Sequence, residues 1–473
     1  MIPDRILKEL RSLVGRANVL DKLVDLQTYA YDAYLERSLP GAVVFVRSCD
    51  DVAGVVKVLH REGLPFAPRG CGTNLSGGSL ALQGGVLIEM SRMNRILEID
   101  VPNQRMVAQP GVFNLDLSTA LGPFGYYYAP DPASQKACSL GGNVAENAGG
   151  PHCFKYGVTS NHVLGIEVVL PDGEVVWFGG KSVDAPGLDL TGLFVGSEGT
   201  LGIVTTVVLR IMRKPEAVKT MLAVYDSIEA AGNTVSAIVA AGLVPATLEL
   251  MDNLVIQAVE DAMACGFPRD AAAVLLIELD GLQDGMEEMT GKIIACCEES
   301  GVREIRVAAD ETERTALWKG RKGAFGAVSR LAPNYLVADG TVPRTKLPEA
   351  LRRVAEVGRT FDLRIASVFH AGDGNLHPTA VTDERNREEV ARVHAFFSDL
   401  YEKVLSMGGT VSGEHGIGIA KKGYLLRQFG KGGMEVMRRI KKGFDPDGRL
   451  NPGKIFLDEE VPAESPIPGG TNG

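Results

Sequence analysis

The spacing of apolar residues divides the chain into two regions with different patterns. Up to about residue 210, short apolar runs typical of strands alternate with glycine-rich loops and a few helical segments. The strands expected in this first region are residues 42–46, 86–89, 106–109, 165–170, 175–178 and 203–211. Residues 1–37 and 51–62 show helical spacing, and the second of these helices is expected to end at Gly63.

The second region begins after Lys214-Pro215 and alternates strands with long helices. The expected strands are residues 220–225, 274–279, 304–308, 335–339 and 364–369, and the expected helices are residues 228–241, 286–300, 347–361 and 385–407. Long helices between strands of this length predict an α+β domain with helices on an antiparallel sheet. The tail, 458–473, is rich in Pro, Gly and Glu and is expected to be loose.

Length and composition narrow the class of protein. A chain of 473 residues suggests two or three domains. The net charge of −10 argues against nucleic acid as a partner. No transmembrane segment is expected, because the uncharged stretch 230–248 contains polar residues, Pro245 and two glycines. The seven scattered cysteines, without any C-x-x-C, indicate a cytoplasmic protein that holds no iron–sulfur cluster of its own.

Candidate metal chemistry lies between residues 370 and 415, where four of the seven histidines fall. Residues 365–381 read as a hairpin whose two-residue turn is Asp373-Gly374. That turn would place His370 directly opposite His377, with Cβ atoms roughly 5 Å apart. Glu414 is then a natural third ligand of an open His/His/carboxylate site for Zn, Mn or Fe(II), while His415 would project elsewhere and be available to handle protons. The ordinary alternative is that these are surface or structural core histidines.

Three glycine-rich loops in the first region are candidates for a long cofactor held mainly by backbone. They are residues 69–78, 141–150 and 196–202. The first follows a strand and could offer convergent N–H groups to a diphosphate. None of the three carries the Rossmann or the P-loop pattern. The alternative is that these loops are only tight turns.

Longer stretches resemble one flavoprotein family. Arg69–Gly78 resembles the diphosphate loop of the vanillyl-alcohol-oxidase type of flavoproteins. The stretches similar to the FAD-linked subunits of bacterial glycolate oxidases are Tyr128–Ser134, Cys138–Gly150, His152–Gly157, Val368–Pro378, Val411–Gly418 and Phe444–Lys454. These motifs keep their order from about residue 20 to residue 456. The D-lactate and D-2-hydroxyglutarate dehydrogenases are similar relatives.

The resemblance implies an α+β fold in which a PCMH-type FAD-binding domain of two subdomains is joined to a substrate-carrying cap domain on an antiparallel sheet. The expected FAD-binding domain covers residues 1–215, with an N-terminal helical segment 1–37. The expected cap, of the FAD-linked oxidase C-terminal type, covers residues 216–425. Residues 426–457 would return to the flavin, and residues 458–473 would form the tail.

By motif position the resemblance also implies the residues that contact FAD. They are Arg69, Gly70, Cys71, Gly72, Thr73, Asn74, Ser76, Gly77, Pro130, Asp131, Ser134, Gly141, Gly142, Asn143, Asn147, Gly149, Tyr156, Gly157, Glu198, Gly199, Gly202, Ile203 and Asn451. Some relatives attach FAD covalently through a histidine in the diphosphate loop. This loop has Cys71 and no histidine, so we expect non-covalent FAD.

The substrate site follows from the same resemblance. His370, His377 and Glu414 would hold the metal, His415 would be the base, and Arg321 would bind the substrate carboxylate. The D-2-hydroxyglutarate relatives carry a lysine where this chain has Val337, which argues against a second distal carboxylate on the substrate. His152 and His162 are expected to be structural.

The leading hypothesis is FAD-dependent, metal-assisted oxidation of a small D-2-hydroxy acid, with hydride transfer to flavin, glycolate first and D-lactate as the alternative. Two hypotheses from other classes stay open: a metal-dependent hydrolase, and a cofactor-binding subunit without turnover of its own. An iron–sulfur subunit or an electron-transfer flavoprotein is the expected electron acceptor. Such a partner could also bring a cytoplasmic protein to the periphery of the inner membrane.

Overall fold

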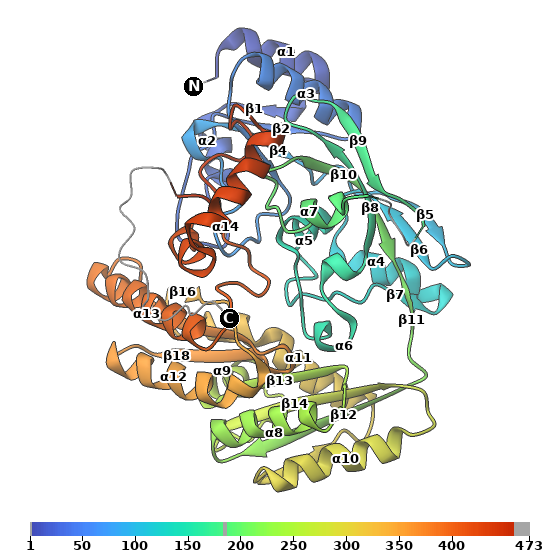
Figure 1. The fold of residues 1–473 in the computed structure, drawn as a ribbon, viewed down its shortest axis with the longest axis vertical. Helices are drawn as coiled ribbons and strands as arrows, with labels where there is room; N and C mark the ends of the chain where they lie inside the picture. Colours follow the sequence, from blue (N-terminus) through green and yellow to red (C-terminus); the bar gives the residue numbers. More distant parts are fainter. Residues whose placement is uncertain (1, 183–186, 458–473) are drawn as a thin grey trace. The chain divides into compact units, whose positions relative to one another are not determined.

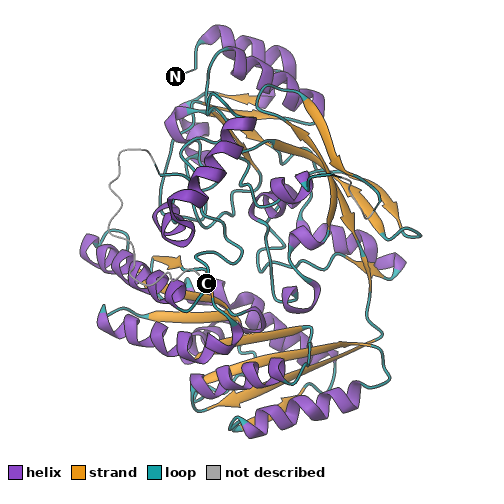
Figure 2. Cartoon of the chain, in the orientation of Figure 1, coloured by secondary structure: helices purple, strands orange, loops and turns teal. Residues whose placement is uncertain are grey.

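The computed structural model describes residues 2–182 and 187–457, which form two compact units that interleave along the sequence. The described residues of unit 1 are 2–148, 158–182, 187–213 and 414–457. Unit 2 comprises residues 149–157 and 214–413. Figure 1 colours the elements by sequence, and Figure 2 shows helices and strands in both units.

Unit 1 contains a four-stranded sheet in the order β1-β2-β4-β3. Its strands are β1 (Val19–Leu20), β2 (Ala42–Phe45), β4 (Val86–Glu89) and β3 (Phe66–Arg69). β2 and β3 both run parallel to the central β4, and all residues of β2 and β4 are buried. Burial on both faces explains why these strands are continuous apolar runs.

A second, antiparallel sheet of unit 1 has the order β5-β6-β10-β8-β9. Its strands are β5 (Ile96–Asp100), β6 (Arg105–Ala108), β10 (Ile203–Arg210), β8 (Val163–Val169) and β9 (Val175–Gly179), while β7 (Tyr126–Tyr127) and β11 (Met212–Arg213) form a separate pair. The helices of unit 1 are α1 (Asp4–Val14), α2 (Leu23–Leu26), α3 (Cys49–Arg61), α4 (Asn114–Leu121), α5 (Leu140–Glu146), α7 (Leu190–Phe194) and α14 (Lys422–Phe444).

The expectation of helix throughout residues 1–37 is wrong in part. α1 ends at Gly15, whose φ of 90° no helix accommodates. Val19 and Leu20 then pair with Val44 and Val43 of β2, so an edge strand interrupts the helical pattern. The amphipathic face of α1 packs with α3 into the core of the four-stranded sheet.

Unit 2 is built on one antiparallel sheet in the order β15-β12-β14-β13-β18-β19-β16, with β17 beside β19. The strands are β12 (Ala217–Tyr225), β13 (Thr247–Asp252), β14 (Ala273–Gly281), β15 (Glu304–Val307), β16 (Asn334–Val337), β17 (Gly340–Thr341), β18 (Ile365–His370) and β19 (Asn375–Thr382). The helices are α6 (Cys153–Tyr156), α8 (Ile228–Ala240), α9 (Asn253–Met263), α10 (Met286–Glu299), α11 (Glu311–Val328), α12 (Leu347–Thr360) and α13 (Arg387–Ser406).

Helices cover both faces of this sheet. Leu222 and Val224 of β12 point to the core formed with α9 and α11. Tyr225 points the other way, where its hydroxyl lies 2.8 Å from Thr234 Oγ1 of α8. Because side chains alternate along a strand, the even-numbered positions of β12 face α9 and α11, and the odd-numbered positions face α8.

The two units depart from the expected boundaries at two places. The chain passes from unit 1 to unit 2 after Arg213, close to the expected boundary at residue 215, but it returns at Glu414 rather than after residue 425. Residues 149–157 belong to unit 2 although they lie inside the stretch expected to bind FAD. Among the described residues, no helix is long and apolar enough to cross a membrane.

Candidate functional site

β18 and β19 form the hairpin that carries His370 and His377. Val368 lies opposite His377, and His370 lies opposite Asn375. The expected turn, with His370 opposite His377, is therefore wrong: residues 371–373 form a 3-10 turn, and Gly374 takes a φ of 72°. The register differs from the expected one by two residues, which keeps both histidines on one face. Their ring centroids lie 5.1 Å apart, edge to face.

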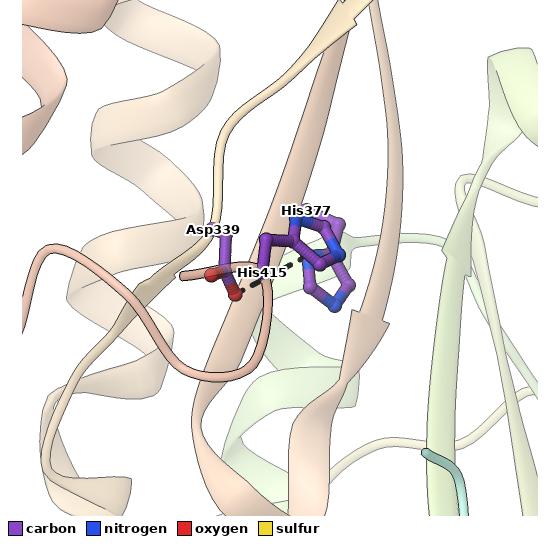
Figure 3. Close-up of side chains that lie close together, drawn as sticks. All are labelled: Asp339, His377 and His415. Carbon is purple, nitrogen blue, oxygen red and sulfur yellow. Dashed lines mark ion pairs between the residues drawn. The ribbon is translucent and has the colours of Figure 1, made fainter. Parts of the chain in front are cut away.

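Both histidines are buried, and each uses its Nδ1 atom within unit 2. His370 Nδ1 lies 2.9 and 3.0 Å from the two carboxylate oxygens of Glu249. His377 Nδ1 lies 3.3 Å from the Ala338 carbonyl oxygen and 3.8 Å from Asp339 Oδ1, the ion pair drawn in Figure 3. A histidine whose Nδ1 is hydrogen-bonded within the protein coordinates a metal through Nε2. The pair therefore fits a shared metal ion.

Arg321 lies on α11, only 1% exposed, and forms an ion pair with Glu249. Its Nη2 atom is 3.4 Å from His370 Nδ1, so the expected substrate-binding arginine is next to the expected metal ligand. Nε and Nη1 of Arg321 have no hydrogen-bond partner among the described residues. Burial raises the pKa of Glu249, but the charges of Arg321 and His370 outweigh burial and lower that pKa below its usual range.

Glu249 was not predicted from the sequence. The only signal was a carboxylate in the otherwise apolar run Thr247–Met251 of β13. In the sheet Glu249 lies directly opposite His370, which no local pattern reveals.

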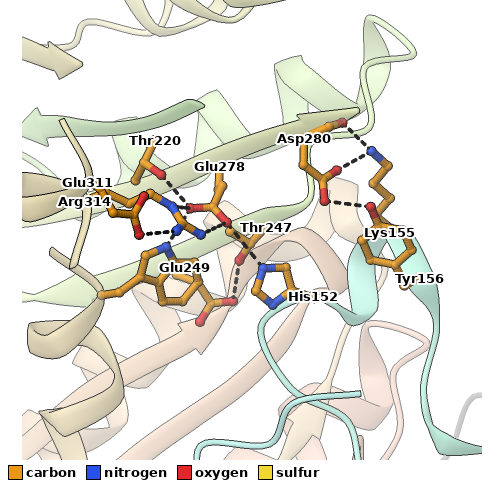
Figure 4. Close-up of polar contacts among 11 residues, drawn as sticks. His152, Lys155, Tyr156, Thr220, Thr247, Glu249, Glu278, Asp280, Glu311 and Arg314 are labelled. Carbon is orange, nitrogen blue, oxygen red and sulfur yellow. Dashed lines mark hydrogen bonds and ion pairs between the residues drawn. The ribbon is translucent and has the colours of Figure 1, made fainter. Parts of the chain in front are cut away.

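A second buried carboxylate, Glu278 of β14, also faces α11 (Figure 4). It accepts hydrogen bonds from Trp318 Nε1 at 2.6 Å and from Arg314 Nε at 3.0 Å. Although burial raises the pKa of Glu278, its hydrogen bonds to His152 and Arg314 lower that pKa well below the usual range. His152 also stacks on Trp318, with ring centroids 5.4 Å apart, in agreement with a structural role.

The end of unit 2 is fixed beside His377. Ser412 Oγ donates to Asp339 Oδ2 at 2.7 Å, and the Gly413 N–H donates to the Asp339 carbonyl at 3.1 Å. A Cβ at Gly413 would lie 2.6 Å from Asn375 Nδ2, so a larger residue there would have to displace that side chain. Glu414 and His415 follow directly as the first residues of the returning part of unit 1.

Within unit 1, the segment that begins with Glu414 and His415 is tied to two of the glycine loops. Ser76 Oγ donates to the His415 carbonyl at 3.1 Å, and the Ile419 N–H donates to the Ser76 carbonyl at 2.8 Å. Glu198 accepts from the Ile417 N–H at 2.6 Å and from the Gly418 N–H at 2.7 Å. Both carboxylate oxygens of Glu198, an expected FAD contact, are thus used by this segment.

The first glycine loop folds tightly after β3. Asn74 Oδ1 accepts from the N–H groups of Ser76 at 2.9 Å and Gly78 at 2.7 Å. The buried Arg69 folds back beneath the loop, where its Nη2 atom donates to the Tyr31 carbonyl at 2.8 Å. A Cβ at Gly72 would lie 2.2 Å from that Nη2 atom. Cys71 and Thr73 are half-buried, and Gly77 has a φ of 78°.

The second loop forms α5 and packs directly on the first. A Cβ at Gly70 would lie 2.2 Å from Ser139 Oγ, which caps α5 by accepting from the Gly142 N–H at 3.3 Å. Asn143 is buried, and Asn147 ends α5 with a φ of 53°. The remaining expected contacts nearby are Gly141 against Pro110, Pro130 as an acceptor for Asn114, the buried Asp131 and the exposed Ser134.

The third loop and the C-terminal segment complete the cluster. The Glu198 N–H donates to the Ala145 carbonyl of α5 at 2.8 Å. Asn451 Nδ2 donates to the carbonyls of Gly78 at 3.1 Å and Glu198 at 2.8 Å, and so bridges the first and third loops. Gly199 has a φ of 63°, a Cβ at Gly202 would meet Val168 at 2.4 Å, and Ile203 is the buried first residue of β10. The structure therefore brings these expected contacts together, as one elongated cofactor would require.

Gly149, Tyr156 and Gly157 are the exceptions, because they belong to unit 2. The Tyr156 hydroxyl donates to Asp280 Oδ2 at 2.6 Å, and Lys155 pairs with the same carboxylate (Figure 4). The segment 149–157 is thereby held on β14, beside Glu278.

The half-buried Glu146 and the buried Glu198 place two interacting carboxyls in unit 1, and Glu146 was not predicted from the sequence. Burial raises the pKa of both carboxyls, and for Glu146 the charge of Glu198 raises it further. Glu146 Oε1 accepts from Asn74 Nδ2 at 2.7 Å, which links it to the first loop. In the same unit, His162 is buried with its ring edge against Tyr128, again a structural position.

Comparison with family models matches residues 40–179 to an FAD binding domain and residues 214–455 to the FAD linked oxidases, C-terminal domain. "Glycolate oxidase subunit GlcD" of Escherichia coli (strain K12) is 44% identical over 452 residues, covering 95% of this chain and 90% of the relative. "D-lactate dehydrogenase" of Anaerostipes hadrus is 34% identical over 466 residues, covering 96% and 97% respectively.

A solved structure of p-cresol methylhydroxylase with bound substrate matches with a TM-score of 0.83 at 18% identity, over 97% of this chain and 98% of that chain. At this identity the match bears on the fold alone. Together with the family models it confirms the expected α+β architecture of an FAD-binding domain and a second domain on an antiparallel sheet.

Proposed function

The chain belongs to the FAD-linked oxidases, and from this premise we propose that it oxidises a small D-2-hydroxy acid, glycolate before D-lactate, with metal assistance. Family membership makes it an FAD-dependent oxidoreductase. The observation that carries the proposal is the buried pair His370 and His377 with Arg321 beside it. Family membership argues against a hydrolase, and the histidine pair supports assistance by a metal.

FAD would be held by the cluster of three glycine loops and Asn451 in unit 1, and when bound it accepts the hydride from the substrate carbon that bears the hydroxyl. His370 and His377 would hold a divalent ion through Nε2, and such an ion acidifies a coordinated hydroxyl. Zn, Mn and Fe(II) all suit this donor set.

Glu414 is proposed as the third ligand because of the contacts made by the residue that precedes it. Gly413 is hydrogen-bonded to Asp339, whose carboxylate pairs with His377. The next Cα atom lies ~3.8 Å further along the chain, so Glu414 starts beside the histidine pair. His415 follows as the proposed base for the hydroxyl proton, and Ser76 restrains its carbonyl.

Arg321 is proposed to bind the substrate carboxylate. Its Nε and Nη1 atoms, which have no hydrogen-bond partner among the described residues, are buried donors that a carboxylate can satisfy. Glu249 already occupies Nη2, so the charge of Arg321 is partly balanced before substrate arrives. These donors would orient the substrate without covalent chemistry.

The testing experiment is steady-state kinetics of the purified holoprotein with a dye acceptor and a panel of 2-hydroxy acids. We expect glycolate or D-lactate to give the highest kcat/KM. A higher kcat/KM for D-2-hydroxyglutarate would contradict the proposal, since Val337 offers no charge for a second carboxylate. No turnover with any 2-hydroxy acid would favour the non-catalytic subunit instead.

A further inference from the structure

We propose that Glu249 is a positioning residue that fixes both the tautomer of His370 and the orientation of Arg321. It would keep His370 protonated on Nδ1, so that the lone pair of Nε2 faces the metal. This inference deepens the proposed function and rests on His370 being a metal ligand. It adds a carboxylate from β13, a strand outside the ligand hairpin.

The geometry places one carboxylate between the two functional side chains. Glu249 lies opposite His370 in the strand register and is 1% exposed. One oxygen lies 2.9 Å and the other 3.0 Å from His370 Nδ1. Arg321 pairs with the second oxygen, and Thr247 Oγ1 donates to the first at 3.3 Å.

Acceptor chemistry explains why this position needs a carboxylate. An ionised carboxylate only accepts hydrogen bonds, so its contact with Nδ1 requires a proton on that nitrogen. A glutamine could turn its NH₂ group toward Nδ1 and stabilise the opposite tautomer, with the proton on Nε2. That tautomer cannot coordinate a metal through Nε2. Carboxylates that orient a ligating histidine in this way commonly affect metal affinity 10- to 100-fold.

Glu278 provides a matched control. It is also a buried carboxylate, 2% exposed, on the same face of the sheet, and it also accepts from residues of α11. Its partners Arg314 and Trp318 are not proposed ligands. Glu278→Gln therefore removes a buried charge from the same helix–sheet interface without touching His370.

The experiment measures the dissociation constant for Zn²⁺ of FAD-loaded protein, by competition with a chromophoric chelator, for the wild type and for Glu249→Gln, Glu249→Asp and Glu278→Gln. We expect Glu249→Gln to bind Zn²⁺ about 10- to 100-fold more weakly. Glu278→Gln should bind as the wild type does. Glu249→Asp keeps an acceptor-only group and should lose less affinity than Glu249→Gln. Retained FAD reports that each variant is folded.

A second readout is the ¹⁵N shift of the His370 ring in the metal-free protein, which distinguishes the two neutral tautomers. We expect the Nδ1–H tautomer in the wild type and a shift toward Nε2–H in Glu249→Gln. Equal Zn²⁺ affinity in Glu249→Gln and the wild type would overturn the inference, as would equal losses in the Gln and Asp variants. A wild type that binds no Zn²⁺, Mn²⁺ or Fe²⁺ would instead overturn the metal site itself.

Discussion

At the scale of single residues, the site depends on which ring nitrogen of each histidine contacts another residue of the protein. His370 Nδ1 contacts Glu249, and His377 Nδ1 lies near Ala338 and Asp339. In the proposed site both rings would present the same nitrogen to a shared ion, and removal of either ring would remove a ligand outright rather than change its orientation. The loops proposed to bind flavin lie in the other unit, so flavin binding should be unaffected.

We predict that His377→Ala loses stoichiometric metal and most turnover while it keeps FAD. Loss of one of three ligands should weaken metal binding by well over tenfold. Metal analysis after dialysis, together with the flavin spectrum, measures both quantities. His152→Ala is the control, because His152 contacts Glu278 and Trp318 and no proposed ligand. Full activity of metal-free wild type would contradict the prediction.

Cys71 is the one residue of the first glycine loop that could attach flavin covalently. Burial raises the pKa of its thiol to about 11, so the nucleophilic thiolate is scarce at neutral pH. We predict that acid precipitation releases all yellow colour into the supernatant. Colour that stays with the denatured wild type, and is absent from denatured Cys71→Ala, would show a covalent link.

Glu89, next to Arg69 beneath the first glycine loop, predicts a pH dependence of stability. Burial raises the pKa of Glu89 from 4.5 to about 7. The folded protein therefore holds a proton between pH 4.5 and 7 that the unfolded chain has lost, and stability falls as pH rises through this window. Relative to Glu89→Gln, which does not titrate, the wild type should lose roughly 3 kcal/mol of unfolding free energy from below pH 4.5 to above pH 7. Urea unfolding at several pH values tests this, and a flat difference would contradict it.

At the scale of elements, α11 organises unit 2 because the side chains along one face of this helix contact several strands of the sheet. Arg314 and Trp318 bind Glu278 of β14, and Arg321 binds Glu249 of β13. Further along the helix, Phe325 lies edge to face with His377 of β19, centroids 6.4 Å apart. The spacings of four, three and four residues are those of one helical face. One face of α11 thus sets polar contacts of β14 and β13 and packs an aromatic ring against β19.

The sequence predicted the hairpin strands but could not give their register or this helix. The two-residue turn at Asp373-Gly374 was the simplest interpretation, whereas Ala371 to Asp373 form a 3-10 turn. Both histidines still lie on one face of the hairpin, because strand side chains alternate with period two and the register differs from the expected one by two residues. α11 went unrecognised, although Asp310 and Glu313 form a capping pattern at its start, because charged residues such as Arg314 and Arg321 interrupt the apolar spacing of the sequence. In the structure Glu278 pairs with Arg314 and Glu249 pairs with Arg321.

The short segment 149–157 predicts a local effect at this scale. Asp280 holds it through Tyr156 and Lys155. We predict that Asp280→Asn speeds amide hydrogen exchange in residues 153–157 by about tenfold, since a bond to a charged acceptor contributes ~1.5 kcal/mol or more. Exchange followed by mass spectrometry measures this. Asp383→Asn, which removes an exposed pair with Arg385, should leave this segment unchanged, and unchanged exchange in Asp280→Asn would contradict the prediction.

At the scale of the whole molecule, the residues proposed to bind the cofactor and those proposed to bind the substrate belong to different units. Unit 1 contains the glycine loops, and unit 2 contains the histidine pair, Glu249 and Arg321. The apolar pattern of the sequence changes at Lys214-Pro215, and the two compact units change after Arg213. The return at Glu414 could not be predicted from the sequence, since Gly413 and Glu414 lie within one continuous motif. A motif can span a boundary when its residues serve both units.

The last prediction concerns how electrons leave this molecule. All seven cysteines are free thiols, distributed over both units, and an iron–sulfur cluster needs four sulfur ligands together. Reduced flavin has to be reoxidised, and we infer an iron–sulfur protein or an electron-transfer flavoprotein as its electron acceptor. We predict that the isolated chain reduces a dye rapidly with glycolate or D-lactate, and oxygen at least tenfold more slowly. Parallel assays of dye reduction and hydrogen peroxide on one preparation measure both rates, with His377→Ala as the inactive control. Peroxide formed as fast as the dye is reduced would identify an oxidase that needs no partner.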